Sequence, residues 1–274
     1  MKMYLYVVIL KVYEFWRYII MDINKLLKLS IRAGTLMLQS GAETYRVEET
    51  ICRICNSYDI DSAESFVTPT GIMVSICANN QTYSLVTRIS SRGVNLHRIE
   101  EINALSRYIT SNSPDFDFIE KELEKISEEK RYSDPITIFF SALAAACFSW
   151  LFGGNWNDFA VTFFIGGFIK ILSIKFYKLQ INDFFINLIC AGVSALLAII
   201  AMNLGFVNEI DKTIIGSIML LVPGLAITNA IRDTIAGDFL AGITKAFEAV
   251  LVAVSIAVGT GMVLSLWIRI FGGI

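Results

Sequence analysis

Long apolar runs dominate the chain after Asp134. A transmembrane α-helix needs about 20 largely apolar residues, and five runs in this region approach or exceed that length. The runs are Pro135–Phe152, Phe159–Ile174, Phe184–Leu204, Ile214–Ala230 and Leu240–Trp267. Because their connections are short, successive helices should pack as antiparallel neighbours. The pattern predicts an α-helical integral membrane protein in which residues 134–274 form a five-helix transmembrane domain.

In residues 22–133 the hydrophobic stretches are shorter, and their pattern is typical of a small mixed α/β domain. Apolar positions from Leu26 to Leu38 predict a helix that stops near Ser40-Gly41. Ser40 and Glu43 match the S-x-x-E capping box, which would begin a second helix that continues to Tyr58.

The rest of this domain is predicted to combine strands and helices. The β-rich stretches are Glu64–Thr68, Ile72–Ala78 and Thr82–Ile89, with Asn79-Asn80 as the hairpin turn between the last two. Asn95 should open a further helix, and a last charged helix should run from Phe116 to Lys130.

The first 21 residues allow two interpretations. Lys11, Glu14 and Arg17 interrupt the apolar run at intervals of three residues, which would place them along one side of an amphipathic helix at a membrane interface. Alternatively, translation starts at Met21 and the extension is an artefact. A cleavable signal peptide is disfavoured, because the charges break the apolar core and no small-residue cleavage site follows.

Composition and charge support a membrane protein with a soluble domain. The chain is 55% hydrophobic, and of its 48 charged residues only 14 follow Asp134. The net charge of -2 and the lack of an Arg/Lys stripe argue against a nucleic-acid partner. The lipid bilayer is therefore the expected environment of the C-terminal half.

The distribution of basic residues predicts the orientation. Lys121, Lys125, Lys130 and Arg131 precede the first predicted span and Lys170, Lys175 and Lys178 follow the second. The loop Gly153–Asp158 has no basic residue. Because cytoplasmic loops are enriched in Lys and Arg, the N-terminal domain is expected on the cytoplasmic side of the plasma membrane, which in bacteria is the inner membrane.

Cofactor and enzyme signatures are missing from the sequence. Cys52 and Cys55 form a C-x-x-C, but a second pair is absent and the only histidine is His97, so neither a zinc site nor a disulfide framework is indicated. No G-x-S-x-G, H-E-x-x-H, G-x-G-x-x-G or Walker A motif occurs. We therefore expect a protein that is not an enzyme and binds no metal or cofactor.

Polar residues gather around a proline-glycine pair in the membrane half. They are Pro223, Gly224, Thr228, Asn229, Arg232, Asp233, Asp238, Lys245 and Glu248. Proline removes a backbone donor and glycine weakens the helix, and transporters use such broken helices to build binding sites. This set is the predicted substrate and ion pathway, with Arg232 meeting a substrate carboxylate and Asp233, Asp238 or Glu248 carrying a proton. Alternatively, Pro223 makes only a kink, and the charges belong to ordinary helix ends.

A second polar set lies in the soluble domain. It comprises Ser40, Gly41, Glu43, Thr44, Arg46 and Glu48 near a helix start, and Thr68, Pro69, Thr70 and Gly71 between two strands. Capping and turn chemistry account for most of these residues. A catalytic role for them is the less favoured interpretation.

Several ordered strings resemble the threonine/serine exporter family, in particular its split members. They are Ala33-Gly34, Ser40 through Glu48, Phe66 through Gly71, Arg92 through Leu96, Asn103 through Arg107, Val222-Pro223-Gly224, Asn229 through Asp233, and Gly237-Asp238. The resemblance implies a cytoplasmic domain fused to five spans, and a second small membrane subunit that supplies the missing half. It also implies ion-driven export of small hydroxylated amino acids or of a dicarboxylate such as succinate.

The sequence therefore predicts one subunit of a secondary exporter, partnered by another membrane subunit or by further copies of itself. Two alternatives remain. A membrane-anchored enzyme would use the region of Glu43–Arg46 and Thr68–Gly71, and a solute sensor would use the soluble domain with the spans as an anchor.

Overall fold

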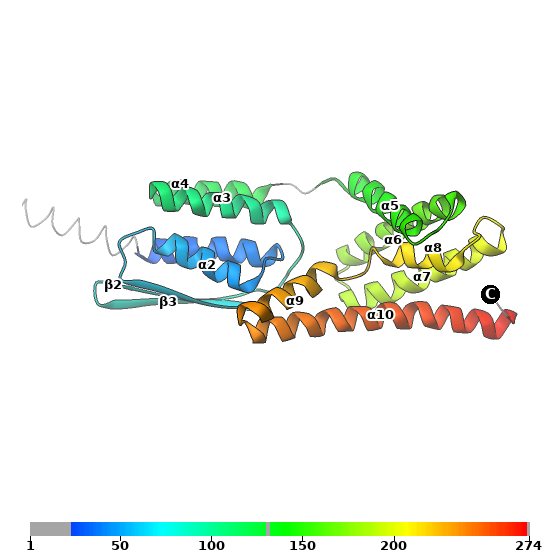
Figure 1. Ribbon diagram of the computed structural model, residues 1–274. Helices are drawn as coiled ribbons and strands as arrows, with labels where there is room; N and C mark the ends of the chain where they lie inside the picture. The colour runs from blue at the N-terminus through cyan, green and yellow to red at the C-terminus, as the bar shows by residue number, and fades with distance from the viewer. Residues whose placement is uncertain (1–22, 130–131, 273–274) are drawn as a thin grey trace, which may run out of the picture. The chain divides into compact units, whose positions relative to one another are not determined.

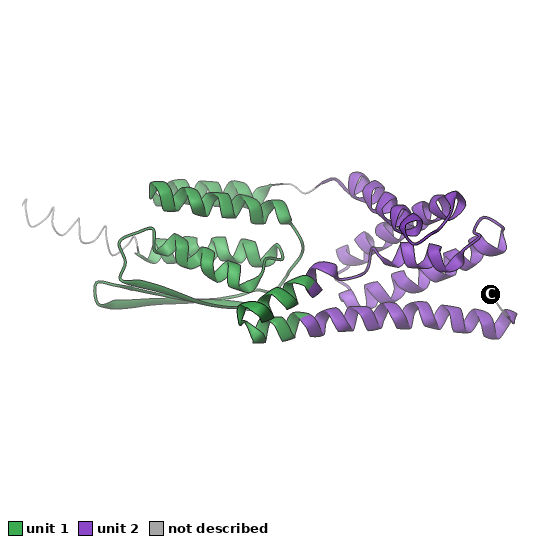
Figure 2. Cartoon of the chain, viewed as in Figure 1, with its two compact units in different colours: residues 1–130, 228–245 green, residues 131–227, 246–274 purple. Residues whose placement is uncertain are grey.

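The computed structural model describes residues 23–129 and 132–272, so the prediction for residues 1–21 lies outside the described part. The chain forms two compact units (Figure 2). The first contains residues up to 130 together with 228–245, and the second contains 131–227 and 246–274. The sequence had placed the domain boundary at 133 and assigned all later residues to the membrane domain. The first unit thus includes a segment from the second half of the chain.

Helices form most of the first unit (Figure 1). A helix over residues 23–39 is followed by α2 (Thr44–Cys55), and α3 (Leu96–Asn112) and α4 (Phe116–Glu128) follow the sheet. A side chain at Gly34 would place its Cβ 2.5 Å from Cδ1 of Ile51. Glycine at this position therefore lets the first helix pack closely against α2.

The sheet of the first unit has three antiparallel strands in the order β1 (Ser62–Thr68), β2 (Gly71–Ala78) and β3 (Gln81–Arg88). Asn79 and Asn80 have φ angles of 52° and 63° and join β2 to β3. Such positive φ angles are those of the tight hairpin turns that match strand twist, and the predicted hairpin is confirmed. Val67, Ile72, Val74 and Ile76 are buried in the core shared with the helices.

The start of α2 corrects one prediction. Glu43 is the N-cap residue but makes no side-chain capping bond, and the Ser40 hydroxyl is buried without a partner among the described residues. The predicted capping box is therefore wrong, because the Glu43 carboxylate is used in an ion pair with Arg232. At α3 the predicted cap is confirmed, since the Asn95 side chain accepts a hydrogen bond from Arg98 N at 3.1 Å.

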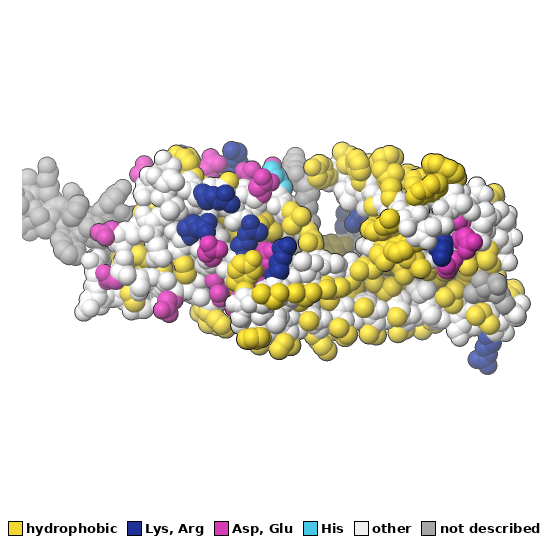
Figure 3. Space-filling model, in the orientation of Figure 1, with side chains coloured by type: hydrophobic (Ala, Val, Ile, Leu, Met, Phe, Trp, Pro, Cys, Tyr) yellow, Lys and Arg dark blue, Asp and Glu magenta, His cyan; other side chains and the backbone are white. Residues whose placement is uncertain are grey.

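Among the residues that the structure describes, four helices are long and apolar enough to cross a membrane. They are α5 (Asp134–Leu151), α6 (Trp156–Lys178), α7 (Asp183–Asn203) and α10 (Phe239–Phe271). Figure 3 shows hydrophobic side chains over much of the second unit, whereas charged side chains gather on the first. Apolar outward faces of this kind are expected where helices meet lipid.

The predicted span Ile214–Ala230 is not one continuous helix. The structure has α8 (Ile210–Ile218) and α9 (Gly224–Ala236), with an interruption that contains Pro223. Proline cannot donate the backbone bond that would continue α8, and its ring clashes with the preceding turn. The break that the proline-glycine pair predicted is thus confirmed. The number of five spans stays a prediction, with α8 and α9 in place of the fourth.

Close approach of helices in the second unit depends on small residues. A Cβ added at Gly166 would lie 2.5 Å from the Ala145 side chain, and one at Gly259 would lie 2.1 Å from the Leu188 carbonyl oxygen. These positions bring α6 against α5 and α10 against α7. Packing through small residues is usual where helices associate within a bilayer.

Candidate functional site

A glycine and two backbone hydrogen bonds fix the conformation of the turn between the first helix and α2. Gly41 has a φ of 87°, and a Cβ there would lie 2.8 Å from the carbonyl oxygen of Gly93. Gly93 N donates to Gln39 O and Asn95 N donates to Ser40 O, each at 2.9 Å. Only glycine adopts this conformation without strain and also fits the space. The turn therefore presents its remaining polar backbone groups in fixed directions.

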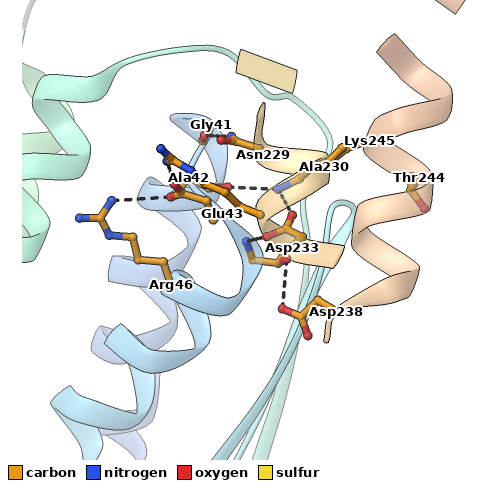
Figure 4. A network of polar contacts seen from close by, with 12 residues as sticks. Gly41, Ala42, Glu43, Arg46, Asn229, Ala230, Asp233, Asp238, Thr244 and Lys245 are labelled. Carbon is orange, nitrogen blue, oxygen red and sulfur yellow. Dashed lines mark hydrogen bonds and ion pairs between the residues drawn. The ribbon is translucent and has the colours of Figure 1, made fainter. Parts of the chain in front are cut away.

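Residues 228–245 of α9 and α10 bind to these backbone groups (Figure 4). The bonds run from Asn229 Nδ2 to Gly41 O (2.8 Å), from Lys245 Nζ to Ala42 O (3.3 Å) and from Thr44 N to Asp233 Oδ1 (3.0 Å). The third bond places a carboxylate at the N-terminus of α2, where the helix dipole favours negative charge. The turn and the two later helices are thus joined by specific polar contacts.

A buried ion pair lies at the centre of this region. Lys245 Nζ lies 2.7 Å from Asp233 Oδ2, and the two side chains are 8% and 0% exposed. Both oxygens of Asp233 are engaged, one by Lys245 and the other by Thr44 N. Removing two charges from water is costly unless each is paired and hydrogen-bonded. Here both conditions are met.

A second ion pair involves Glu43, whose side chain is 6% exposed. Its carboxylate pairs with Arg232 and, at 3.7 Å, with Arg46. Burial by itself raises the pKa of Glu43, but hydrogen bonds from its own backbone N–H and from Arg232, with the charges of both arginines, hold the pKa below its ordinary value. Arg232, predicted to meet a substrate carboxylate, thus has a protein carboxylate as partner while 56% of its side chain is exposed.

Two further carboxylates, Glu48 and Asp238, lie beside the buried pair and are half-buried. Val67 N donates to Glu48 Oε1 at 2.7 Å, and the Thr44 hydroxyl donates to Asp238 Oδ2 at 3.4 Å. Burial raises the pKa of Glu48, and the charges of Asp238 and Asp233 raise it further. The pKa of Asp238 is raised by burial and then by Asp233.

The structure therefore brings some residues of each predicted set together in one cluster. We call it the α2–α9 cluster and define it as Gly41, Glu43, Thr44, Arg46, Glu48, Asn229, Arg232, Asp233, Asp238 and Lys245. All ten residues belong to the first unit. Sequence reasoning had treated them as separate, because partners such as Thr44 and Asp233 lie 189 positions apart in the chain.

Other predicted residues lie outside the cluster. Thr68, Pro69, Thr70 and Gly71 form the turn between β1 and β2, where Thr68 Oγ1 donates to Gly71 O at 3.3 Å. Thr228 is exposed on α9, and Ser40 contributes through its carbonyl to the turn described above. Pro223, Gly224 and Glu248 belong to the second unit.

A polar site that sequence reasoning missed lies in the second unit. Asp158 is fully buried, and its carboxylate accepts backbone hydrogen bonds from Asn155 and Asn208 at 3.0 Å and from Glu209 at 3.3 Å. Asn155 and Asp158 form a reciprocal capping box at the start of α6. The N-x-x-D spacing in the sequence could have predicted this capping box.

No group of His, Cys, Asp or Glu suited to a metal occurs within residues 23–129 and 132–272.

The described residues include four helices long and apolar enough to cross a bilayer, one of them after a helix break, which are the features of a multi-pass membrane protein. Residues 28–267 match the family described as "Putative threonine/serine exporter". The chain belongs to this family and is a membrane transport protein. The family is one of transporters. No solved structure matches the chain.

Curated relatives include proteins of two sizes. The "Probable succinate transporter subunit YjjP" of Escherichia coli (strain K12) is 27% identical over 88% of this chain and 94% of the relative. The "Probable threonine/serine exporter" of Mycobacterium tuberculosis is 24% identical over 86% of this chain but 45% of the relative. The "Threonine/serine exporter" of Corynebacterium glutamicum is 22% identical over 86% of this chain and 50% of the relative. The chain thus matches one relative over nearly its whole length and spans about half of the other two.

Proposed function

We propose that this chain is one subunit of a secondary exporter for threonine, serine or a small dicarboxylate. The first unit would lie in the cytoplasm and the apolar helices in the plasma membrane. The observation that supports the proposal is the α2–α9 cluster, in which the start of α2 binds the charged segment that follows a helix break. The relatives' names supply the substrate classes.

The interruption between α8 and α9 supports a solute pathway. α8 ends at Ile218 and α9 begins at Gly224, within a stretch of high hydrophobicity. Irregular backbone at membrane depth is tolerated only where it is buried in protein or lines a water-filled cavity. Transporters place binding sites at such discontinuous helices. Pro223, Gly224 and Thr228 would therefore belong to the pathway, together with Glu248 on α10.

Arg232 would recognise the carboxylate that all the proposed substrates share. More than half of its side chain is exposed although it pairs with Glu43. The guanidinium group has five N–H donors in a planar fork, so it can bind a second carboxylate without leaving the first. Glu43 would then hold Arg232 in position instead of competing with the solute for every donor.

A partner subunit would complete the pathway. The chain spans about half of the longer relatives, and the relative of similar length is named a subunit. A second small membrane protein would supply the other half, and copies of this chain could also associate with one another. Ion-driven export agrees with the absence of a nucleotide-binding motif from the sequence.

Transport in reconstituted vesicles tests the proposal. Efflux of labelled serine, threonine and succinate would be measured from three kinds of vesicle. One kind contains this chain alone, one contains only the membrane protein encoded by the neighbouring gene, and one contains both proteins. We expect one of these solutes to move only when both are present. If the pair moves none of them, the spans act as an anchor for a sensor or an enzyme, and the exporter proposal is wrong.

The Arg232→Ala variant tests whether Arg232 recognises the substrate carboxylate. We expect it to insert normally and to lose most efflux, because the fork that binds the carboxylate is gone. Arg53→Ala is the matched control, since Arg53 forms an exposed pair with Glu49 on α2 outside the cluster. Parental efflux by the Arg232→Ala variant would remove this residue from the substrate pathway.

A further inference from the structure

The α2–α9 cluster contains four carboxylates and three cationic side chains. Glu43 is paired with two arginines, and Asp233 is paired with Lys245. The remaining carboxylates, those of Glu48 and Asp238, form no ion pair among the described residues. Their hydrogen bonds come from the neutral donors Val67 N and the Thr44 hydroxyl. The cluster therefore has two carboxylates whose charge is not balanced by a cation of their own.

The geometry directs Glu48 and Asp238 toward the same place. Thr44 and Glu48 are four residues apart on α2 and so lie on one face of that helix. Thr44 binds Asp233 through its N–H and Asp238 through its hydroxyl. Gly237, with a φ of 98°, ends α9, and Asp238 N donates to Asp233 O at 2.8 Å. This turn holds the Asp238 carboxylate against the face of α2 that carries Glu48.

Three carboxylates thus lie near one another at the contact between α2 and the turn that follows α9, and one of them pairs with a lysine. They are Glu48 from α2, Asp233 from α9 and Asp238 from the turn, and Lys245 comes from α10. Glu43, the N-cap residue of α2, pairs with Arg46 of α2 and with Arg232 of α9. Like charges in a partly buried site disfavour ionisation of all members. Burial and the neighbouring acids accordingly raise the pKa of both Glu48 and Asp238.

We propose that Glu48 and Asp238 form a proton-binding site that holds the turn after α9 against α2 when a proton is bound, and weakens this contact when both groups are ionised. The proton comes from water at the first unit and returns to it. Asp233 is excluded as the carrier because Lys245 and Thr44 N engage both of its oxygens. The use of this site for ion coupling rests on the proposed exporter function, whereas the binding of the proton does not.

The direction in which stability changes with pH depends on how many protons the folded and unfolded chains bind. A carboxyl group whose pKa is higher in the folded than in the unfolded chain binds more protons in the folded state. The stability that it contributes is full below its ordinary pKa and is lost as the pH rises through the folded value. Stability should therefore fall as the pH rises from about 4 toward neutrality, and removal of either charge should reduce that loss.

Melting temperatures of the purified full chain in detergent, measured across this pH range, test the site. The variants are Glu48→Gln, Asp238→Asn and the double variant. Each substitution removes a charge and keeps the oxygen that accepts the bond from Val67 N or from Thr44. Glu49→Gln is the matched control, because Glu49 is the adjacent residue on α2 and its exposed side chain pairs with Arg53.

We expect each single variant to melt at a higher temperature than the parent near pH 8, with a smaller decrease between acid and neutral pH. The double variant should gain less than the sum of the two single gains, because either substitution removes the shared repulsion. Glu49→Gln should keep the parental profile. If one single variant does not fold, the other removes the same repulsion and carries the test.

Lower melting temperatures for both variants near pH 8, with the parental pH dependence intact, would overturn the proposal. Strictly additive gains would overturn it as well, because they would show that the two groups do not share a site. Efflux assays separate this result from the exporter function. A melting profile as expected, in a pair of proteins that moves no solute, would leave the proton site in place and reject the transport role.

Discussion

Asp233 in the first unit and Asp158 in the second are both fully buried, yet they are satisfied in different ways. Asp233 is bound by a lysine from α10 and by the N–H of Thr44, which lies 189 positions away in the chain. Asp158 is bound by three backbone N–H groups at helix starts. Backbone donors are neutral and fixed, whereas a side-chain cation brings a charge that other acids can share.

This difference separates a structural aspartate from one within a candidate functional site. The Asp158 carboxylate completes the start of α6 and ties it to the loop before α8, which a helix needs in any environment. The Asp233 carboxylate joins three helices of the first unit and lies beside two acids with raised pKa values. A charge network of this kind, with perturbed acids, is typical of functional sites.

The largest expected effect comes from Lys245→Met, which removes the cation and leaves Asp233 buried without its partner. We expect the free energy of unfolding of the full chain in detergent to fall by about 3–5 kcal/mol. Denaturant or thermal unfolding measures it. Lys212→Met, which breaks the more exposed pair with Asp211, should lose much less stability, because solvent screens an exposed pair.

Equal losses for the two lysine variants would show that the buried pair has no special role. The double variant Asp233→Asn with Lys245→Met sharpens the comparison. It should be more stable than Lys245→Met alone, because no unpaired charge is left in the interior.

A smaller loss is expected for Asp158→Asn, which turns one acceptor oxygen into an amide donor opposite backbone N–H groups. The penalty for a buried donor left unsatisfied is about 1–3 kcal/mol, and unfolding of the full chain would reveal it. Asp183→Asn is the control, because Asp183 is an exposed residue in the first turn of α7. An effect no larger than that of the control would mean that the hydrogen bonds of Asp158 contribute little.

The smallest effect concerns pH and Glu43. Its pKa is held below the ordinary value, so the stability that it contributes is present above that value and is lost as the pH falls through the folded pKa. Glu43→Gln should therefore make the acid side of the melting profile flatter. Glu64→Gln, at an exposed position of β1, should not change it. An unchanged profile for Glu43→Gln would contradict the ion pairs assigned to this residue.

Local patterns predicted most of the secondary structure. The hairpin at Asn79-Asn80, the cap at Asn95 and the break near Pro223 follow from the conformational preferences of those residues, and each is found in the structure. The capping box at Ser40 was predicted by the same kind of rule and is wrong, because Arg232 from a distant helix takes the Glu43 carboxylate. A local rule fails where a tertiary partner offers a stronger interaction.

The sequence by itself determined that this is a membrane protein with an N-terminal region of helices and strands, which residues carry charge in its apolar half, and where a helix breaks. Only the tertiary structure decided that Glu43, Thr44 and Glu48 belong to the same site as Asp233 and Asp238. Hydrophobic periodicity and turn preferences depend on residues that are close in the sequence, so the sequence alone reveals them. A polar contact between positions almost 190 apart depends on how the helices pack, and no local pattern records that.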